Sequence, residues 1–326
     1  MPLRVPLGWE DGRYGSIFPP PTSHFPMPRP LIVPFTKMSG AGNDFVVLDN
    51  RFLRFSDAEL GALAARVCPR RVGVGADGLL ALDAADDAAD DAGGADFRMR
   101  YRNADGSLAT MCGNGARCLA RFAVRAGLGR ETPSGAVAVT FDTDGGRYRA
   151  HVLGAGRRAS GAVRLDVPPP GEPAAIDGFA DVLAFDGAPA PLVRIWTGTE
   201  HVVAFVPDAA AVDLSHVGPL VRHDAAFAPA GTNLNVAHVA SRGAGTTAAQ
   251  VVARTFEKGV EGETLACGTG ALAVALAAFH TGRVATPAVV VSMPGGDLAV
   301  TFEPGSVSRL TLEGPAETIY EGTLEM

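Results

Sequence analysis

A five-residue frame, Cys-Gly-x-Gly-Ala, occurs twice in this chain and constrains its fold more than any other feature. The copies are residues 112–116 and 267–271, so their cysteines lie nearly half of the 326 residues apart. Each copy follows a predicted strand, opens an apolar helical run and leads to a hairpin with paired glycines: residues 137–141 with Gly145-Gly146, and residues 289–293 with Gly295-Gly296. The same order of elements twice indicates an internal duplication.

A cysteine at the start of a helix faces the positive end of the helix dipole and unpaired N–H groups. We expect this position to lower the pKa of Cys112 and Cys267 and to raise their thiolate fractions. The small neighbours leave backbone N–H groups open to a carboxylate. Two such helix starts facing each other would hold one anionic substrate between two thiols. One thiolate would remove a proton from a carbon, and the other thiol would return one from the opposite face, which inverts that carbon.

Other interpretations stay open from the residues alone. The two cysteines are also compatible with packing, or with a redox pair in a non-catalytic binder or thiol redox protein. A pyridoxal-phosphate racemase needs a Schiff-base lysine, and Lys37 and Lys258 are the two lysines of the chain. Cys118 is interpreted as a core residue. The helix after Cys112 is predicted to turn residues 119, 122, 123 and 126 to the core, and residues 117, 121 and 125, all arginines, to the opposite face.

Charge and cysteine use exclude several classes. A net charge of −7 and a pI near 5.5 argue against nucleic acid as a partner. No apolar run is long enough to span a membrane, so no membrane partner is expected. Four cysteines without CxxC or zinc-like spacing predict neither a disulfide framework nor a metal site, and favour a reducing cytoplasm. Residues 1–32 are rich in Pro and Gly and are predicted to form a disordered extension.

The motifs resemble those of the diaminopimelate epimerases, which interconvert LL- and meso-diaminopimelate without a cofactor in lysine and peptidoglycan precursor biosynthesis. The resemblance covers about residues 33–326. It rests on residues 38–45 (MSGAGNDF), residues 103–107 (NADGS) continuing to residues 112–117 (CGNGAR), residues 231–233 (GTN), and residues 257–259 (EKG) continuing to residues 267–270 (CGTG).

The resemblance implies an α+β fold of two pseudo-symmetric domains, each with mixed β-structure around a central helix, and an active site in the interdomain cleft. The domains would be residues 33–166 plus 314–326, and residues 167–313. Cys112 and Cys267 would be the acid–base pair, supported by His201 and Glu257. The residues that would bind the substrate, diaminopimelate, are Asn43, Asn103, Gly113, Asn114, Asn233, Glu257, Lys258, Gly268 and Thr269. No cofactor is expected, and the expected assembly is a homodimer.

Three departures from the family pattern concern the distal end of the substrate. Lys258 stands where many members have an arginine, which binds a carboxylate bidentately and more specifically. One extra residue lies between Lys258 and Cys267. Thr199 stands where many members have an asparagine before the histidine. The alternative within the same fold is a proline or hydroxyproline racemase, which shares the paired cysteines but lacks the distal-end asparagines.

Overall fold

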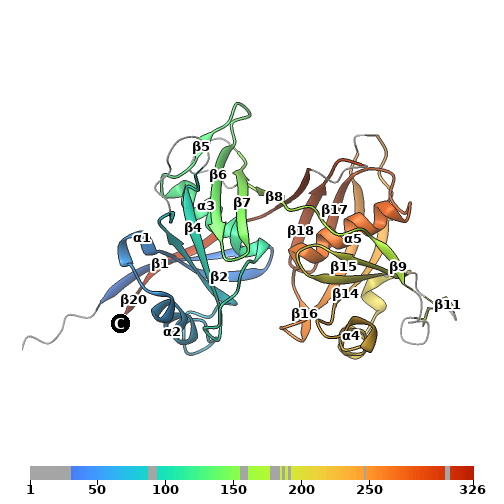
Figure 1. The fold of residues 1–326 in the computed structure, drawn as a ribbon, viewed down its shortest axis with the longest axis horizontal. Coiled ribbons are helices and arrows are strands. Elements are labelled where there is room, and N and C mark those ends of the chain that lie inside the picture. Colours follow the sequence, from blue (N-terminus) through green and yellow to red (C-terminus); the bar gives the residue numbers. More distant parts are fainter. Residues whose placement is uncertain are drawn as a thin grey trace, which may run out of the picture.

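The computed structural model describes residues 31–86, 94–154, 161–176, 184–185, 188–189, 192–245, 247–304 and 309–326. These residues form two β-rich halves that lie side by side (Figure 1). The predicted extension of residues 1–32 lies almost wholly outside the described residues, as does much of the aspartate-rich stretch of residues 83–96. No helix in the described part of the chain is long and apolar enough to cross a membrane.

The first half winds strands around one central helix, α3. Its elements are β1 (Ile32–Gly40), β2 (Asn43–Asp49), α1 (Asn50–Leu53), α2 (Asp57–Val67), β3 (Gly78–Asp83), β4 (Phe97–Asn103), α3 (Gly113–Arg125), β5 (Arg130–Glu131), β6 (Val137–Thr143), β7 (Gly146–Val152) and β8 (Val163–Val167). Helix α2 begins at a capping box, in which the Ser56 side chain accepts from the Glu59 N–H and the Glu59 carboxylate accepts from the Ser56 N–H.

The second half repeats this plan around α5. Its elements are β9 (Ala174–Ile176), β10 (Ala184–Phe185), β11 (Ala188–Pro189), β12 (Leu192–Trp196), β13 (Glu200–Phe205), the 3₁₀ helices η1 (Ala209–Ala211) and η2 (Ala225–Phe227), α4 (Leu214–Arg222), β14 (Asn233–Ser241), β15 (Ala249–Glu257), β16 (Gly262–Thr264), α5 (Gly268–His280), β17 (Ala288–Met293), β18 (Gly296–Thr301) and β19 (Leu310–Gly314). The chain ends with β20 (Glu317–Glu325).

Strand pairing shows the duplication directly. The order β20-β1-β2-β3-β4-β6-β7-β8 has the same alternation of antiparallel and parallel pairs as the order β9-β12-β13-β14-β15-β17-β18-β19. The strand after β8 pairs in the second half, and the strand after β19 pairs in the first. The halves therefore exchange their last strands, and β8 and β19 pair antiparallel where the chain crosses. The return of β20 to β1 is the placement that the family resemblance implies.

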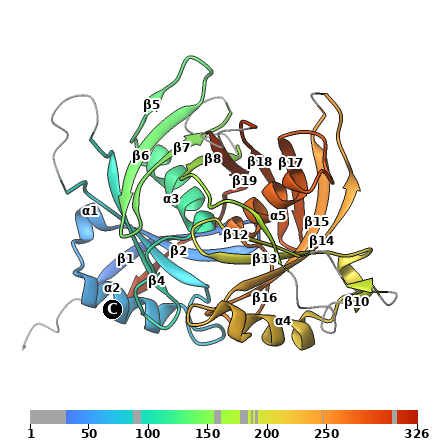
Figure 2. The ribbon, with the colours of Figure 1, turned by 45° about the vertical axis from the view of Figure 1, so that its right-hand side comes forward.

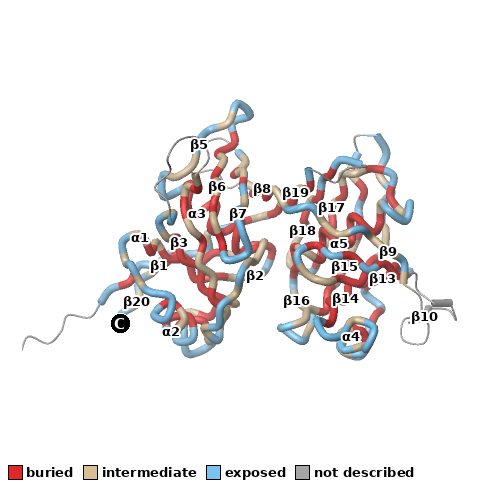
Figure 3. Tube along the Cα trace, in the orientation of Figure 1, coloured by how far each residue is buried: buried red, intermediate tan, exposed pale blue. Residues whose placement is uncertain are grey.

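The buried residues of each half gather on its strands and on its central helix (Figure 3). Helix α5 is apolar and buried on nearly every face. The prediction for α3 was wrong in part: Arg117 is fully buried, Arg121 is 9% exposed and Ala126 is exposed, whereas Leu119 and Ala123 are buried and Arg125 is exposed, as predicted. The crossing of the chain explains this, because α3 packs against β8 (Figure 2). Arg117 donates to the Pro315 carbonyl, between β19 and β20, and Arg121 donates to the Gly161 carbonyl, just before β8.

Candidate active site at the two helix starts

Cys112 and Cys267 occupy the same structural position in the two halves. Each is the N-cap residue of its helix, with extended backbone (φ −141° and −119°). Each carbonyl accepts the first helical hydrogen bond, from Ala116 N–H at 2.8 Å and from Ala271 N–H at 2.9 Å. A Cys-Gly-x-Gly-Ala frame suits this position, because side chains on the first turn would cover the free N–H groups that follow the cysteine.

The paired-glycine turns brace the two cysteine loops in the same way. The Gly145 N–H donates to the Thr110 carbonyl at 3.1 Å, and the Gly295 N–H donates to the Leu265 carbonyl at 2.7 Å. Each carbonyl belongs to the residue two positions before a cysteine. The two repeated hairpins therefore have the same role: each holds the segment of chain that precedes a cysteine.

The two cysteine frames meet each other across the halves. The Asn114 side-chain amide, on the first turn of α3, donates to the carbonyl of Ala266 at 3.1 Å, immediately before Cys267. Leu312 of β19 lies beneath both helix starts. A Cβ added to Gly113 would lie 3.7 Å from the Leu312 side chain, and one added to Gly268 would lie 3.0 Å from it. The site is thus assembled from both halves at the point where they cross.

The prediction that the helix starts lower the pKa of both thiols was wrong. Burial raises the pKa of Cys112, although the Gly115 and Asn114 N–H groups and the Arg117 charge act the other way. Burial also raises the pKa of Cys267 well above its usual value, and the Glu257 carboxylate acts in the same direction. Cys112 is half-buried and Cys267 is 5% exposed. The cost of desolvating a thiolate therefore exceeds the benefit of the helix N-terminus.

Of the asparagines predicted to lie near Cys112, Asn43 faces the thiol, whereas Asn103 bonds to Ser107. The Cys112 thiol faces the Asn43 side-chain oxygen at 3.7 Å, and the Asn43 amide donates to Asp77 at 2.5 Å. Asn103, the last residue of β4, instead donates to the Ser107 hydroxyl at 3.0 Å. Asp77 thus fixes Asn43, while Ser107 holds Asn103 at the end of its strand.

Around Cys267, a buried polar chain ends at the thiol. The Gly270 N–H donates to the Cys267 sulfur at 3.3 Å, and the Thr269 hydroxyl lies 3.4 Å from the same sulfur. His201 Nε2 lies 3.0 Å from that hydroxyl. Burial and the Lys258 charge lower the pKa of His201 to about 3, so the ring is neutral. His201 therefore contacts Cys267 through Thr269 rather than directly.

Asn235 sets the tautomer of the His201 ring. Its amide nitrogen donates to the Val202 carbonyl at 3.0 Å and lies 3.1 Å from His201 Nδ1, while its oxygen accepts from the Thr255 hydroxyl at 2.8 Å. Nδ1 is therefore an acceptor, and the single ring proton is on Nε2, facing Thr269. The Thr269 hydroxyl that accepts this proton can donate its own hydrogen to the Cys267 sulfur.

The second half also contributes three of the predicted site residues: Glu257, Asn233 and Lys258. Burial raises the pKa of Glu257, and hydrogen bonds from Thr264 and Cys267 act the other way. The Asn233 oxygen accepts from the Lys258 N–H at 2.8 Å, and its amide nitrogen lies 3.3 Å from His201 Nε2. The Lys258 ammonium pairs with the Glu200 carboxylate. Glu257 also raises the pKa of Cys112, so its charge acts on both thiols.

The sequence interpretation missed Asn235, Asp77, Arg117 and Glu200. Asn235 was detectable, because it stands two residues after Asn233 in a strand and so lies on the same face. Asp77 and Glu200 stand beside recognised motifs, but their partners, Asn43 and Lys258, are far away in the chain. Only the folded arrangement shows these pairs.

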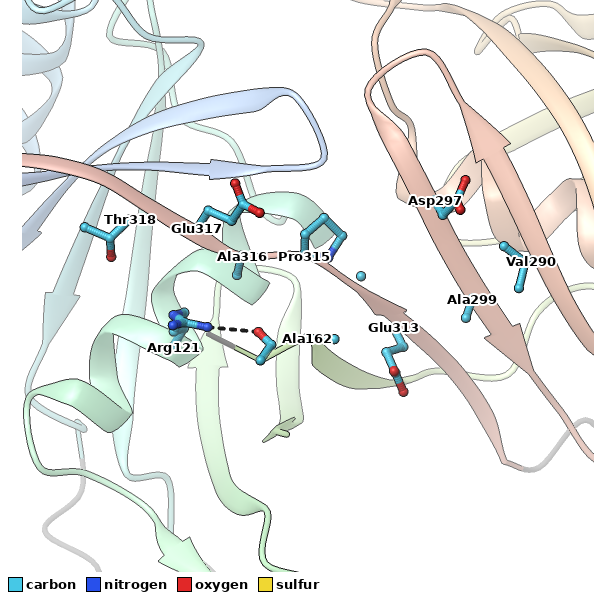
Figure 4. Close-up of a pocket in the computed structure, with 12 residues that line it drawn as sticks. Arg121, Ala162, Val290, Asp297, Ala299, Glu313, Pro315, Ala316, Glu317 and Thr318 are labelled. Carbon is cyan, nitrogen blue, oxygen red and sulfur yellow. Dashed lines mark hydrogen bonds between the residues drawn. The ribbon is translucent and has the colours of Figure 1, made fainter. Parts of the chain in front are cut away.

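A cavity of about 670 Å³ lies elsewhere, between α3, the β19–β20 connection and the β17–β18 hairpin (Figure 4). It is lined by Arg121, by Asp297, Glu313 and Glu317, and by backbone around Pro315, and by none of the predicted site residues. It is a gap between the halves rather than the candidate site. Among the described residues, no group of three His, Cys, Asp or Glu side chains is placed to hold a metal ion.

Comparison with known proteins assigns both halves of the chain to one family. The family model described as diaminopimelate epimerase matches residues 35–165 and 193–319. A diaminopimelate epimerase from Chlorobaculum tepidum is 37% identical over 289 residues, covering 89% of this chain and 100% of that protein. One from Aquifex aeolicus is 35% identical over 297 residues, covering 89% and 97%.

A solved structure of a PhzF-family phenazine biosynthesis protein from Bacillus anthracis has a TM-score of 0.64 at 15% identity, covering 91% of this chain and 100% of that one. At this identity it shows the shared fold alone. The sequence relatives carry the closer assignment, because they cover almost nine-tenths of this chain, and the matched ranges of the family model contain both residue 112 and residue 267. This chain belongs to the diaminopimelate epimerase family.

Proposed function

We propose that this chain is an isomerase that interconverts LL- and meso-diaminopimelate without a cofactor, by proton transfer at the α-carbon between Cys112 and Cys267, in lysine and peptidoglycan precursor biosynthesis. The observation that carries the proposal is the meeting of two equivalent cysteine N-caps, joined by the bond from Asn114 to Ala266. Two acid–base groups of one kind on opposite sides of a carbon are what inversion without a cofactor requires.

The substrate carboxylate at the reacting carbon would bind between the two helix starts. The free N–H groups at Gly113-Asn114 and Gly268-Thr269 would bind it, and the helix dipoles would stabilise the charge that develops on it as the α-proton leaves. Because burial raises the pKa of both cysteines, burial favours the thiol form of each. The substrate ammonium supplies the positive charge that favours one thiolate once it binds.

His201 and Glu257 would support the pair without taking the α-proton. The neutral His201 ring orients the Thr269 hydroxyl toward Cys267, so that the hydroxyl stabilises that sulfur when it is a thiolate. Glu257 acts on the pKa of both thiols and provides an acceptor for the substrate ammonium. Asn43 and Asn233, with Asn103 at the end of β4, would bind the rest of the substrate.

Isotope exchange tests the proposed function. Incubation of the reduced protein with LL-diaminopimelate in D2O is expected to produce the meso isomer with deuterium at the inverted α-carbon, measured by NMR and chiral chromatography. Proline and trans-4-hydroxyproline serve as competing substrates, because a hydroxyproline epimerase from Agrobacterium vitis shares the fold with a TM-score of 0.60 at 15% identity. Exchange with either of these and none with diaminopimelate would transfer the assignment to the alternative.

The distal end of diaminopimelate is itself a zwitterionic amino-acid group, and the Lys258–Glu200 pair matches it. Lys258 would bind the distal carboxylate and Glu200 the distal ammonium, while Thr199 donates to the Glu200 carboxylate at 3.2 Å. This pairing accounts for a lysine in place of the family arginine, because a second charged group shares the recognition. Both side chains are partly exposed, so the expected energies are modest.

Glu200→Gln is expected to raise KM for LL-diaminopimelate about fivefold with little change in kcat, because the distal ammonium loses its partner far from the reacting carbon. Steady-state kinetics on LL-diaminopimelate and on 2-aminopimelate, which lacks the distal amine, would measure this. KM for 2-aminopimelate should stay unchanged. A fall in KM for diaminopimelate would mean that Glu200 competes with the substrate for Lys258.

We also propose a cytoplasmic homodimer. The four cysteines are free in the structure, which suits a reducing compartment. Strand β20 pairs only with β1 among the described strands and exposes Ile319 and Tyr320, so its open edge and these side chains offer a surface for a second copy. Light scattering after size-exclusion chromatography tests the assembly, and a monomer at all concentrations would contradict it.

A further inference from the structure

Arg117 is the most unusual charged group of the described structure. It lies on the second turn of α3 and is 0% exposed, the largest of the fully buried side chains. Its guanidinium donates to three neutral oxygens: the Pro315 carbonyl at 3.2 Å, the Gly113 carbonyl at 3.5 Å and the Asn114 side-chain oxygen at 2.8 Å. No carboxylate of the described residues forms an ion pair with it.

A buried cation without a counter-charge is costly, and the hydrogen bonds satisfy its N–H groups without neutralising it. Burial accordingly lowers the pKa of Arg117, while the Cys118 and Cys112 sulfurs act the other way. Of these two, Cys118 lies fully inside the core of the first half and Cys112 is half-buried at the start of the helix. Arg117 donates to the carbonyl of Gly113, the residue that follows Cys112, so the Cys112 thiolate is the protein anion that can form near it during a reaction.

The same side chain joins the two cysteine frames. Because Arg117 holds the Asn114 oxygen, the Asn114 amide nitrogen is directed to the Ala266 carbonyl next to Cys267. The bond to Pro315 attaches Arg117 to the connection between β19 and β20. A Cβ on Gly314 would lie 3.2 Å from the guanidinium, so the crossing chain is packed directly against it.

We propose that Arg117 is a positioning residue that serves as the buried counter-ion of the Cys112 thiolate and holds the two cysteine frames in register through Asn114. This inference rests on the proposed function, in which Cys112 works as a base. It adds a role to a residue that lies outside the acid–base pair and its substrate contacts. The guanidinium fork is needed for the register, whereas the positive charge alone is needed for the thiolate.

The reactivity of Cys112 tests the charge. The reduced protein is treated with iodoacetamide over a range of pH, and alkylation of the Cys112 peptide is followed by mass spectrometry. Arg117→Gln is expected to raise the midpoint of Cys112 alkylation by about one pH unit, which is about a tenfold slower reaction below the midpoint. Arg125→Gln is the matched control: it removes an exposed arginine of the same helix, bound to Glu321, and should leave the midpoint unchanged. An unchanged midpoint in Arg117→Gln would overturn the proposal.

Arg117→Lys separates charge from register and covers the case in which Arg117→Gln does not fold. The lysine variant keeps the charge and loses the fork, so its Cys112 midpoint should stay near wild type while kcat falls at least tenfold. A midpoint raised in Arg117→Lys would overturn the counter-ion role, and a wild-type kcat would overturn the register role. Alkylation needs no substrate. If the midpoints shift as expected but diaminopimelate shows no exchange, the proposed function fails while the role of the charge stands.

Discussion

Replacing Cys112 or Cys267 with serine is expected to lower the rate of epimerisation by about 10²- to 10⁴-fold, the usual contribution of a general acid or base. A serine hydroxyl is a far weaker acid than a thiol, so it neither becomes an alkoxide base nor returns a proton as readily. Each variant removes one of the two sides on which inversion depends. Stopped-time assays of LL- and meso-diaminopimelate by chiral chromatography would measure the loss in both directions.

Cys118→Ala is the matched control for this experiment. Cys118 lies on the same helix as Cys112 but is fully buried in the first-half core, so its loss should affect stability and leave the rate within about threefold. Serine variants that fold, as judged by circular dichroism, and keep the wild-type rate would contradict the two-thiol mechanism. A loss confined to one of the two cysteines would reduce the mechanism to one base.

The repeat made the architecture of the site predictable. Because both copies of the Cys-Gly-x-Gly-Ala frame precede an apolar run, the sequence alone predicts two helices that begin at a cysteine, and the structure confirms both. The hairpins at Gly145-Gly146 and Gly295-Gly296 were predicted for the same reason, since a repeated turn signal is hard to mistake. Features set by a local pattern, such as these helix starts and turns, are therefore predictable from the sequence.

The errors concern quantities that depend on what covers a residue. The three arginines of α3 follow a helical spacing that usually marks a solvent face, but the connection between β19 and β20 packs against that face and buries Arg117, while Arg125 stays exposed. The pKa of the thiols was predicted from the helix N-terminus alone. Its direction is set by burial, which results from the meeting of both halves. A short stretch of sequence predicts neither the exchange of strands between the halves nor the burial of the two thiols.

The site residues show the same division. Asn43 and Asn114 were recognised from their motifs, yet their partners, Asp77 and Ala266, come from distant parts of the chain. Asn235 was overlooked although it fixes the His201 ring, because an asparagine inside a strand carries no motif of its own. Roles that depend on a long-range partner require the fold.

Mild oxidation is expected to abolish activity, and dithiothreitol to restore it, through a disulfide between Cys112 and Cys267. The two frames already touch through Asn114 and Ala266, and both thiols are free. The thiols lose two protons and two electrons to the added oxidant, for example hydrogen peroxide, which is reduced to water. Because burial raises the pKa of both thiols, the thiolate that starts the reaction is scarce at neutral pH, so inactivation should accelerate as pH rises toward 9.

Counting thiols in the denatured protein before and after oxidation would decide this prediction. Two of the four thiols should disappear together with the activity, and peptide mapping should join the two cysteine frames. Cys112→Ser should prevent the loss of the second thiol, whereas Cys68→Ala, at a buried cysteine on the far side of the first half, should oxidise like wild type. Inactivation with the loss of one thiol would show that the oxidised cysteine stops at the sulfenic acid because the second sulfur cannot reach bonding distance. The two helix starts would then have to hold the thiols apart even when no substrate lies between them, and Arg117 and Asn114 would be the residues that hold them so.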